Sequence, residues 1–233
     1  MPLWEKFFHG YQGSYSIYVH SLQDYKLKAS PSSPFYNRQI PGKVAEWGRM
    51  SMCDAERRLL ANALLDFSNN RFILVSETCI PLFNFTTVYK YLIMSRHSLL
   101  SAFDHHGPFG RGRYNKNMEP EVTLDQWRKG SQWFEVNSKL AVNIVADDIY
   151  YPKFEKFCTP ACYVDEHYFP TMLSIRFGSL IANRSILGNN GKGCKYLRVE
   201  RKRSPMFARK FTLPRDANVD GISLFFNCDQ ERR

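Results

Sequence analysis

The stretch Arg71-Phe-Ile-Leu-Val-Ser76 decides the fold that the sequence predicts. Its four central residues are apolar without alternation, which is typical of a strand covered on both faces. Apolar residues at helical spacing precede it over 59–64, behind a helix-capping candidate at Ser51–Asp54. A second helical pattern follows over Thr86–Met94. The sequence therefore predicts a buried strand between two helices.

The alternation of strands and helices continues along the chain in both directions. Further strands are predicted at 14–20, 97–103 and 132–136, and further helices at 138–147 and 165–175. This order favours an α/β fold with a mainly parallel central sheet. Ligand sites of such sheets lie at the carboxyl ends of the strands, so the predicted site includes the turn after Ser76 and the Gly- and Pro-containing loop 104–123.

The composition is that of a globular protein with an excess of positive charge. The chain has 233 residues, 44% apolar and 15% aromatic, which excludes a disordered chain or a coiled coil. The net charge is +10, and residues 192–215 contain nine Lys or Arg and one Glu. Such a stretch could bind nucleic acid or an anionic small molecule such as a nucleotide diphosphate, or it could simply be solvated.

Cysteines, sequons and hydropathy bear on the compartment of the protein. The six cysteines lack the paired spacing of a zinc site, so no metal site is predicted. Two sequons begin at Asn84 and Asn183, and Cys158 with Cys162 could form a short-loop disulfide in a secretory compartment. The sequence shows no signal peptide and no apolar run long enough to span a membrane.

Two adjacent carboxylates and two loop arginines are candidates for chemistry. Asp165 and Glu166 stand at a predicted helix start, where capping of the helix competes with a role as general base. Arg111 and Arg113 flank a glycine in the long loop. They could bind an anion or sugar hydroxyls, or they could remain solvated.

Two further candidates lie in or next to predicted strands. Glu77 follows the buried strand, where its carboxylate could meet a ligand or cap the next helix. Trp133 lies in a short strand, and its indole could stack on a sugar ring or pack in the core. From these residues alone the sequence predicts an α/β domain with a basic C-terminal segment.

Five segments, all in one order, extend this prediction. They are WGRMSMCDAERRLL (47–60), FILVSETCIPL (72–82), WRKGSQWF (127–134), CYVDEHY (162–168) and FARKF (207–211). Together they resemble the plant branch of the core-2/I-branching β-1,6-N-acetylglucosaminyltransferase family, glycosyltransferase family 14. The resemblance covers residues 2–215.

The resemblance implies a GT-A-like fold and a Golgi membrane protein whose domain faces the lumen. It implies inverting sugar transfer, most simply of N-acetylglucosamine, from a UDP donor to a glycan hydroxyl, with no metal, cofactor or nucleic acid. Glu166 matches the catalytic base of the family, and Lys210 with Arg209 matches its diphosphate-binding motif. On the acceptor side we expect Glu77, Arg111, Arg113, Trp133 and Asp165.

The chain also departs from the family pattern. It opens at Met1-Pro-Leu-Trp4, so we expect the first strand of the sheet and the membrane anchor of full-length members to be missing. An internal gap follows Ser185, where a second diphosphate-binding arginine is expected and where Arg198 or Arg201 could substitute. Residues 1–215 are thus predicted to form an incomplete glycosyltransferase domain, and 216–233 an unmatched tail. The alternative function is a non-catalytic remnant that keeps the fold and has lost donor binding.

Overall fold

The computed structural model describes residues 2–76, 79–159, 162–183, 207–209 and 223–226, with backbone alone for 183, 207–209 and 223–226. Its α-helices are α1 (Pro2–Phe8), α2 (Met50–Leu64), α3 (Phe85–Met94), α4 (Ser138–Val145), α5 (Tyr150–Phe157) and α6 (Tyr168–Phe177). Four short 3-10 helices are η1 (Arg111–Arg113), η2 (Lys116–Met118), η3 (Val164–Glu166) and η4 (Gly178–Leu180). The strands are β1 (Ile17–His20), β2 (Arg71–Ile73), β3 (Val75–Ser76), β4 (Cys79–Pro81), β5 (Ser98–Leu100), β6 (Phe134–Asn137), β7 (Ile181–Asn183), β8 (Phe207–Arg209) and β9 (Ser223–Phe226).

The largest sheet has the strand order β2-β6-β5-β7. β6 pairs antiparallel with both β2 and β5, and among the ladders of the described strands only β5–β7 is parallel. The α/β class is confirmed, and the prediction of a mainly parallel sheet is wrong.

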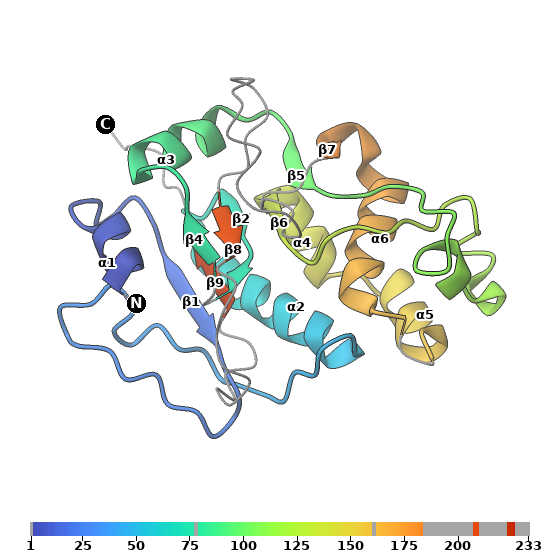
Figure 1. Ribbon diagram of the computed structural model, residues 1–233, viewed down its shortest axis with the longest axis horizontal. Coiled ribbons are helices and arrows are strands. Elements are labelled where there is room, and N and C mark those ends of the chain that lie inside the picture. The colour runs from blue at the N-terminus through green and yellow to red at the C-terminus, as the bar shows by residue number, and fades with distance from the viewer. Residues whose placement is uncertain (1, 77–78, 160–161, 184–206, 210–222, 227–233) are drawn as a thin grey trace.

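The reason lies in how the chain reaches β6. β2 and β5 point in the same direction, since both are antiparallel to β6, and α3 provides the helical crossover that parallel strands require. The next connection is the long loop after β5, which contains only the short turns η1 and η2. The chain then enters the sheet between β2 and β5 in the opposite direction (Figure 1).

Two smaller sheets bring distant parts of the chain together. β9 lies between β1 and β3 and is antiparallel to both, so residues 223–226 of the segment without a family match supply a central strand. β8 pairs antiparallel with β4, which places the backbone of Arg209 opposite Cys79. The predicted buried run at 71–76 thus divides at Leu74 and serves two sheets.

The start of α2 differs from the predicted cap. The helix begins at Met50 after an extended Arg49 that makes no side-chain capping hydrogen bond. Ser51, the expected cap, lies inside the helix, and its hydroxyl accepts a hydrogen bond from the backbone N–H of Glu46 (2.9 Å). The predicted cap is wrong because this hydroxyl holds the preceding loop.

Two apolar clusters form the core. One gathers residues of α2, α4, α5 and α6 around β6, and the other gathers α1, β1 and α3. Figure 1 shows α1 and α3 on one side of the strands and α5 and α6 on the other. Trp133, just before β6, is partly buried and packs against both clusters. It therefore joins the two halves of the core.

Candidate functional site

Glu166, the predicted base, ends η3, the turn that leads into α6. A disulfide between Cys158 and Cys162, the pairing considered in the sequence, anchors the chain just before this turn. The carbonyl of Tyr163 accepts hydrogen bonds from the backbone N–H of Glu166 (2.9 Å) and from Nδ1 of His167 (3.1 Å). The backbone that carries Glu166 is therefore fixed on both sides.

The segment at Lys129 and Gly130 holds Glu166 from a second direction. Lys129 forms a two-way backbone bridge with Phe103, with N···O distances of 2.8 and 2.9 Å. The N–H of Gly130 donates to the carbonyl of Glu166 (2.7 Å). A Cβ at position 130 would lie 1.8 Å from the carbonyl oxygen of Ser101, so only glycine allows this close approach.

Two cations meet one oxygen of the Glu166 carboxylate. Lys129 Nζ donates a hydrogen bond to Oε2, and Nη1 of Arg113 lies 3.9 Å from the same oxygen. The Glu166 side chain is 31% exposed, against 17% for Lys129 and 18% for Arg113. Oε1 forms no hydrogen bond to any residue that the structure describes.

The long loop supplies Arg113 and ties itself together through Arg111. Nε and Nη2 of Arg111 donate to the two carboxylate oxygens of Asp104 (2.8 and 2.7 Å), and Nη2 also reaches Asp125 (3.2 Å). The guanidinium lowers the pKa of Asp104. Arg111 therefore has two carboxylate partners within the loop, whereas Arg113 is directed at Glu166.

A pair of buried acids lies behind Glu166. Asp165 and Glu56 are 2% and 0% exposed, and Gln132 Nε2 donates to Glu56 Oε1 (3.0 Å). Oδ1 of Asp165 and Oε2 of Glu56 are buried without a hydrogen-bond partner among the described residues. Burial and the charge of Glu166 raise the pKa of Asp165 to about 6, and burial and the charge of Asp165 raise the pKa of Glu56 well above its usual range.

The environment of Asp165 bears on both of its predicted roles. Neither η3 nor α6 has a side-chain capping bond at its N-cap, so the structure does not use Asp165 as an N-cap. Its burial favours a supporting role behind Glu166 over contact with an acceptor.

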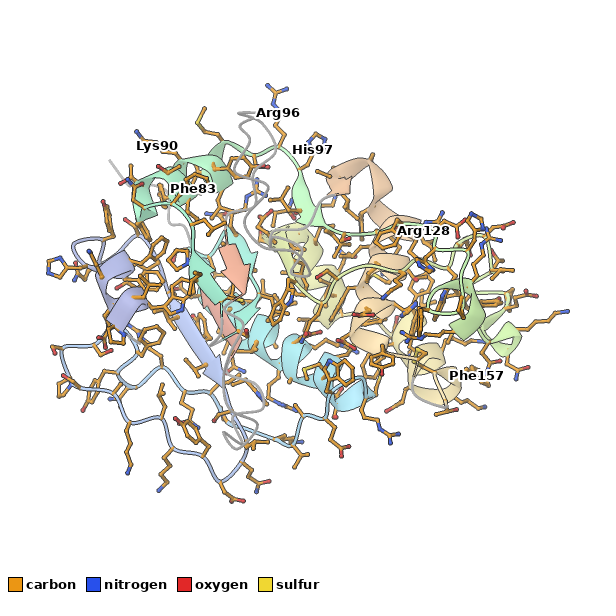
Figure 2. The ribbon with its side chains drawn as sticks, viewed as in Figure 1. Phe83, Lys90, Arg96, His97, Arg128 and Phe157 are labelled. Atoms are coloured by element: carbon orange, nitrogen blue, oxygen red, sulfur yellow. A yellow bond between two sulfur atoms is a disulfide. The ribbon has the colours of Figure 1, made fainter. Side chains whose placement is uncertain are left out.

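A buried histidine links η3 to the long loop. The imidazole of His167 stacks on the indole of Trp127, with ring centroids 4.7 Å apart, and Trp127 Nε1 donates to the carbonyl of Gly110 (3.0 Å). Burial lowers the pKa of His167 to about 4, so the ring is neutral at pH 7 and donates from Nδ1. The stack fixes the loop that carries Arg113 against the turn that carries Glu166. Figure 2 shows Arg128, next to Trp127, in the part of the molecule that contains α5 and α6.

The remaining predicted residues are distributed over the molecule. Glu77 and Lys210 lie outside the described residues, as do Arg198 and Arg201. Arg209 lies in β8, and only its backbone is described. The expected roles of these residues in donor and acceptor binding stay predictions.

The two sequon asparagines also differ in their description. Asn84 is exposed and caps α3, its Oδ1 accepting from the N–H of Thr87 (2.9 Å). A glycan would attach to the other amide atom, Nδ2, so this cap is compatible with modification. Asn183 ends β7, and its side chain lies outside the described residues.

Lys129, His167 and Glu56 were not predicted from the sequence. Lys129 and His167 both lie in segments that carry the family resemblance, and the glycine after Lys129 signals a close backbone approach. Glu56 is spaced three and four residues from Cys53 and Leu60 on the buried face of α2. A charged residue on such a face is the signal that could have identified it.

Comparison with known proteins shows the family to which this chain belongs. The chain is a member of the Core-2/I-Branching enzyme family, whose profile matches residues 1–209. Among curated relatives, glycosyltransferase BC10 of Oryza sativa subsp. japonica is 38% identical over 198 residues, a match that covers 74% of this chain and 49% of the relative. The chain thus spans about half the length of the curated relative that it matches. Within the described residues, no helix is long and apolar enough to cross a membrane.

Proposed function

We propose that this protein is an inverting glycosyltransferase that moves a sugar, N-acetylglucosamine first among the candidates, from UDP to a hydroxyl of a glycan. The observation that carries the proposal is the Glu166 carboxylate, which is partly exposed, held at Oε2 by two cations and mounted on a backbone fixed from two directions. Membership of the Core-2/I-Branching family and the name of the rice relative support the reaction class.

In the proposed step Glu166 removes the proton of the acceptor hydroxyl. The hydroxyl oxygen attacks the anomeric carbon from the face opposite the nucleotide, and the bond from that carbon to the phosphate oxygen breaks. The electron pair leaves with UDP, the configuration inverts, and Glu166 becomes a neutral acid that returns its proton to water. Lys129 and Arg113 orient the carboxylate through Oε2, and Oε1 is available for the proton.

Negative charge that develops on the departing UDP needs stabilisation. We propose that fixed cations supply it, with Lys210 and Arg209 as the candidates from the family motif, and that the reaction needs no metal ion. We also propose a GT-A-like fold for the nucleotide-binding part and a location on the lumenal side of the Golgi. The Cys158–Cys162 disulfide and the exposed sequon at Asn84 support an oxidising compartment.

Calorimetry tests the donor side of this proposal. UDP is titrated into the folded full chain in buffer with and without EDTA. The control is the same titration into lysozyme, a protein without a UDP site. We expect saturable binding of equal affinity in both buffers. Binding that disappears with EDTA would overturn metal independence. Folded protein without any UDP binding would overturn donor recognition and would favour the non-catalytic remnant.

A further inference from the structure

We propose that Trp47, Tyr163 and Arg113 form an acceptor subsite that binds a second sugar ring, adjacent to the sugar whose hydroxyl reacts at Glu166. This inference rests on the proposed function, because it names the part of the acceptor that the same site recognises. It predicts an oligosaccharide acceptor rather than a single sugar.

Trp47 is unusual among the tryptophans of the chain. Its side chain is 69% exposed, whereas Trp4 and Trp127 are at most 3% exposed and Trp133 is partly buried. The exposed indole is supported from one side, because it packs edge-to-face on the ring of Tyr163 with centroids 4.6 Å apart. A large aromatic surface held in place at low conformational cost is suited to binding a ligand.

The backbone on both sides of this ring contact adopts left-handed conformations. Gly48 has φ +73°, and a Cβ there would lie 3.1 Å from Cδ1 of Tyr163. Tyr163 itself has φ +56°, which is costly for a residue with a side chain. The hydrogen bonds that its carbonyl accepts from Glu166 and His167 hold it there. The orientation of the Tyr163 ring is thus coupled to the backbone of Glu166.

Arg113 connects the aromatic pair to the carboxylate. Its guanidinium carbon lies 4.1 Å from the ring centroid of Tyr163 and 5.3 Å from that of Phe109, which is 61% exposed. Its Nη1 is 3.9 Å from Oε2 of Glu166. A continuous series of contacts therefore runs from Trp47 through Tyr163 and Arg113 to Glu166.

This combination of groups matches the chemistry of a sugar. The C–H face of a pyranose packs on an aromatic ring, while its hydroxyls form hydrogen bonds with guanidinium and carboxylate groups. A single exposed aromatic residue is ordinary on a protein surface. Phe67, 97% exposed and without a ring contact among the described residues, is such a case. Trp47 differs because it packs on Tyr163, whose ring also contacts Arg113, the cation near the candidate base.

The test compares one sugar with two. Methyl β-galactoside and the disaccharide N-acetyllactosamine are titrated into the full chain with UDP present, and binding is followed by saturation-transfer NMR. The proteins are wild type, Trp47→Ala, Trp47→Phe and the control Phe67→Ala, each checked for folding by circular dichroism. We expect the disaccharide to bind wild type about tenfold more tightly than the monosaccharide. Trp47→Ala loses this gain, Trp47→Phe keeps most of it, and Phe67→Ala matches wild type.

Two results would overturn the subsite: equal affinity of wild type for both sugars, or a disaccharide gain that survives in Trp47→Ala. Transfer from UDP-N-acetylglucosamine to both sugars is measured in parallel, and there Trp47→Ala raises KM for the disaccharide with little change in kcat. Absence of transfer in every protein, with binding that still depends on Trp47, would overturn the proposed transferase and leave the subsite intact.

Discussion

Lys129 donates a hydrogen bond to the carboxylate of Glu166, although the two residues lie 37 positions apart in the chain. Lys129 is itself fixed by its backbone bridge to Phe103, and the adjacent Gly130 binds the carbonyl of Glu166. One segment thus holds both the backbone and the carboxylate of the candidate base. The ion pair of Lys129 and Glu166 orients the carboxylate. This orienting role is separate from the small contribution that exposed ion pairs make to folding stability.

Loss of the Lys129 ammonium is expected to impair turnover more than folding. Lys129→Met should lower kcat about tenfold to a hundredfold, because a misplaced catalytic group loses the benefit of orientation. Lys129→Arg should recover part of the loss. Steady-state kinetics with UDP-N-acetylglucosamine measure both variants. The control is Lys153→Met, which removes an ion pair to Glu121 (2.6 Å). Equal kcat for Lys129→Met and wild type would contradict a positioning role.

Gly130 is expected to be the most sensitive glycine near the site. Gly130→Ala places a Cβ 1.8 Å from the Ser101 carbonyl oxygen, and the two chain segments must separate. Such overpacking costs about 2 kcal/mol or more, which lowers the melting temperature by roughly 4–8 °C. Gly178→Ala is the matched control, since nothing lies within 4 Å of its added Cβ. Thermal unfolding that shows equal melting temperatures would refute the close contact.

Asp165 is expected to make stability fall as the pH rises. It faces Glu56, Glu166 and Lys129, and its pKa rises to about 6 from an ordinary value of 3.8. Between these values the folded protein binds more protons than the unfolded chain, so the free energy of unfolding decreases with pH. Below the lower pKa value Asp165 costs the folded protein no stability. Above the higher pKa value its ionisation lowers the free energy of unfolding by roughly 3 kcal/mol.

Chemical denaturation across this pH range measures the effect. Asp165→Asn removes the titrating group, so its stability relative to wild type should increase steadily between the two pKa values and then level off. Asp24→Asn, at an exposed position, should show no such trend. A difference between Asp165→Asn and wild type that does not vary with pH would contradict the raised pKa.

The C-terminal segment is expected to contribute to stability through β9. This strand pairs with β1 along Ile17–His20 and with β3 at Val75 and Ser76. Deletion of residues 216–233 leaves the edges of both strands without this partner, with a loss of about 0.5–1.5 kcal/mol for each hydrogen bond and a tendency to aggregate. Deletion of 227–233 keeps β9 and serves as the control. Equal melting temperatures of the two deletions would exclude this role.

Local patterns in the sequence predict the elements better than they predict the sheet. The apolar run at 71–76 is buried as expected, and the helical patterns around it form α2 and α3. Periodicity cannot predict that Leu74 divides the run, because the division depends on a hydrogen bond from its N–H to the distant carbonyl of Phe134 (3.0 Å). The direction of β6 depends in the same way on a long connection without a crossover helix.

Helix α5 shows a second limit. Tyr150, Phe154 and Phe157 stand at helical spacing and pack against the core, but the pattern covers only eight residues and no helix was predicted there. Asp147 holds the start of this helix. The carboxylate of this residue accepts from the N–H of Tyr151 (2.8 Å) and from the hydroxyl of Tyr168 (2.8 Å). The contact with Tyr168, 21 positions along the chain, has no signature in a single sequence.

The site was predictable in part. The motif around Glu166 is short and local, so the family resemblance identifies this residue without a structure. Its partners lie in other segments of the chain: Arg113 ends η1, and Lys129 lies in the backbone bridge to Phe103. Only the fold brings them together, through the bridge at Phe103 and the stack of Trp127 on His167.

The central claim is that Glu166 is the base of a sugar transfer. The most direct measurement is transfer of radiolabelled N-acetylglucosamine from UDP to an oligosaccharide by wild type, by Glu166→Gln and by Glu155→Gln, which changes an exposed glutamate on α5. Loss of a general base lowers kcat by about a hundredfold to ten-thousandfold. We predict such a loss for Glu166→Gln, with unchanged melting temperature and UDP affinity, and full activity for Glu155→Gln. Full transfer by Glu166→Gln would contradict the account.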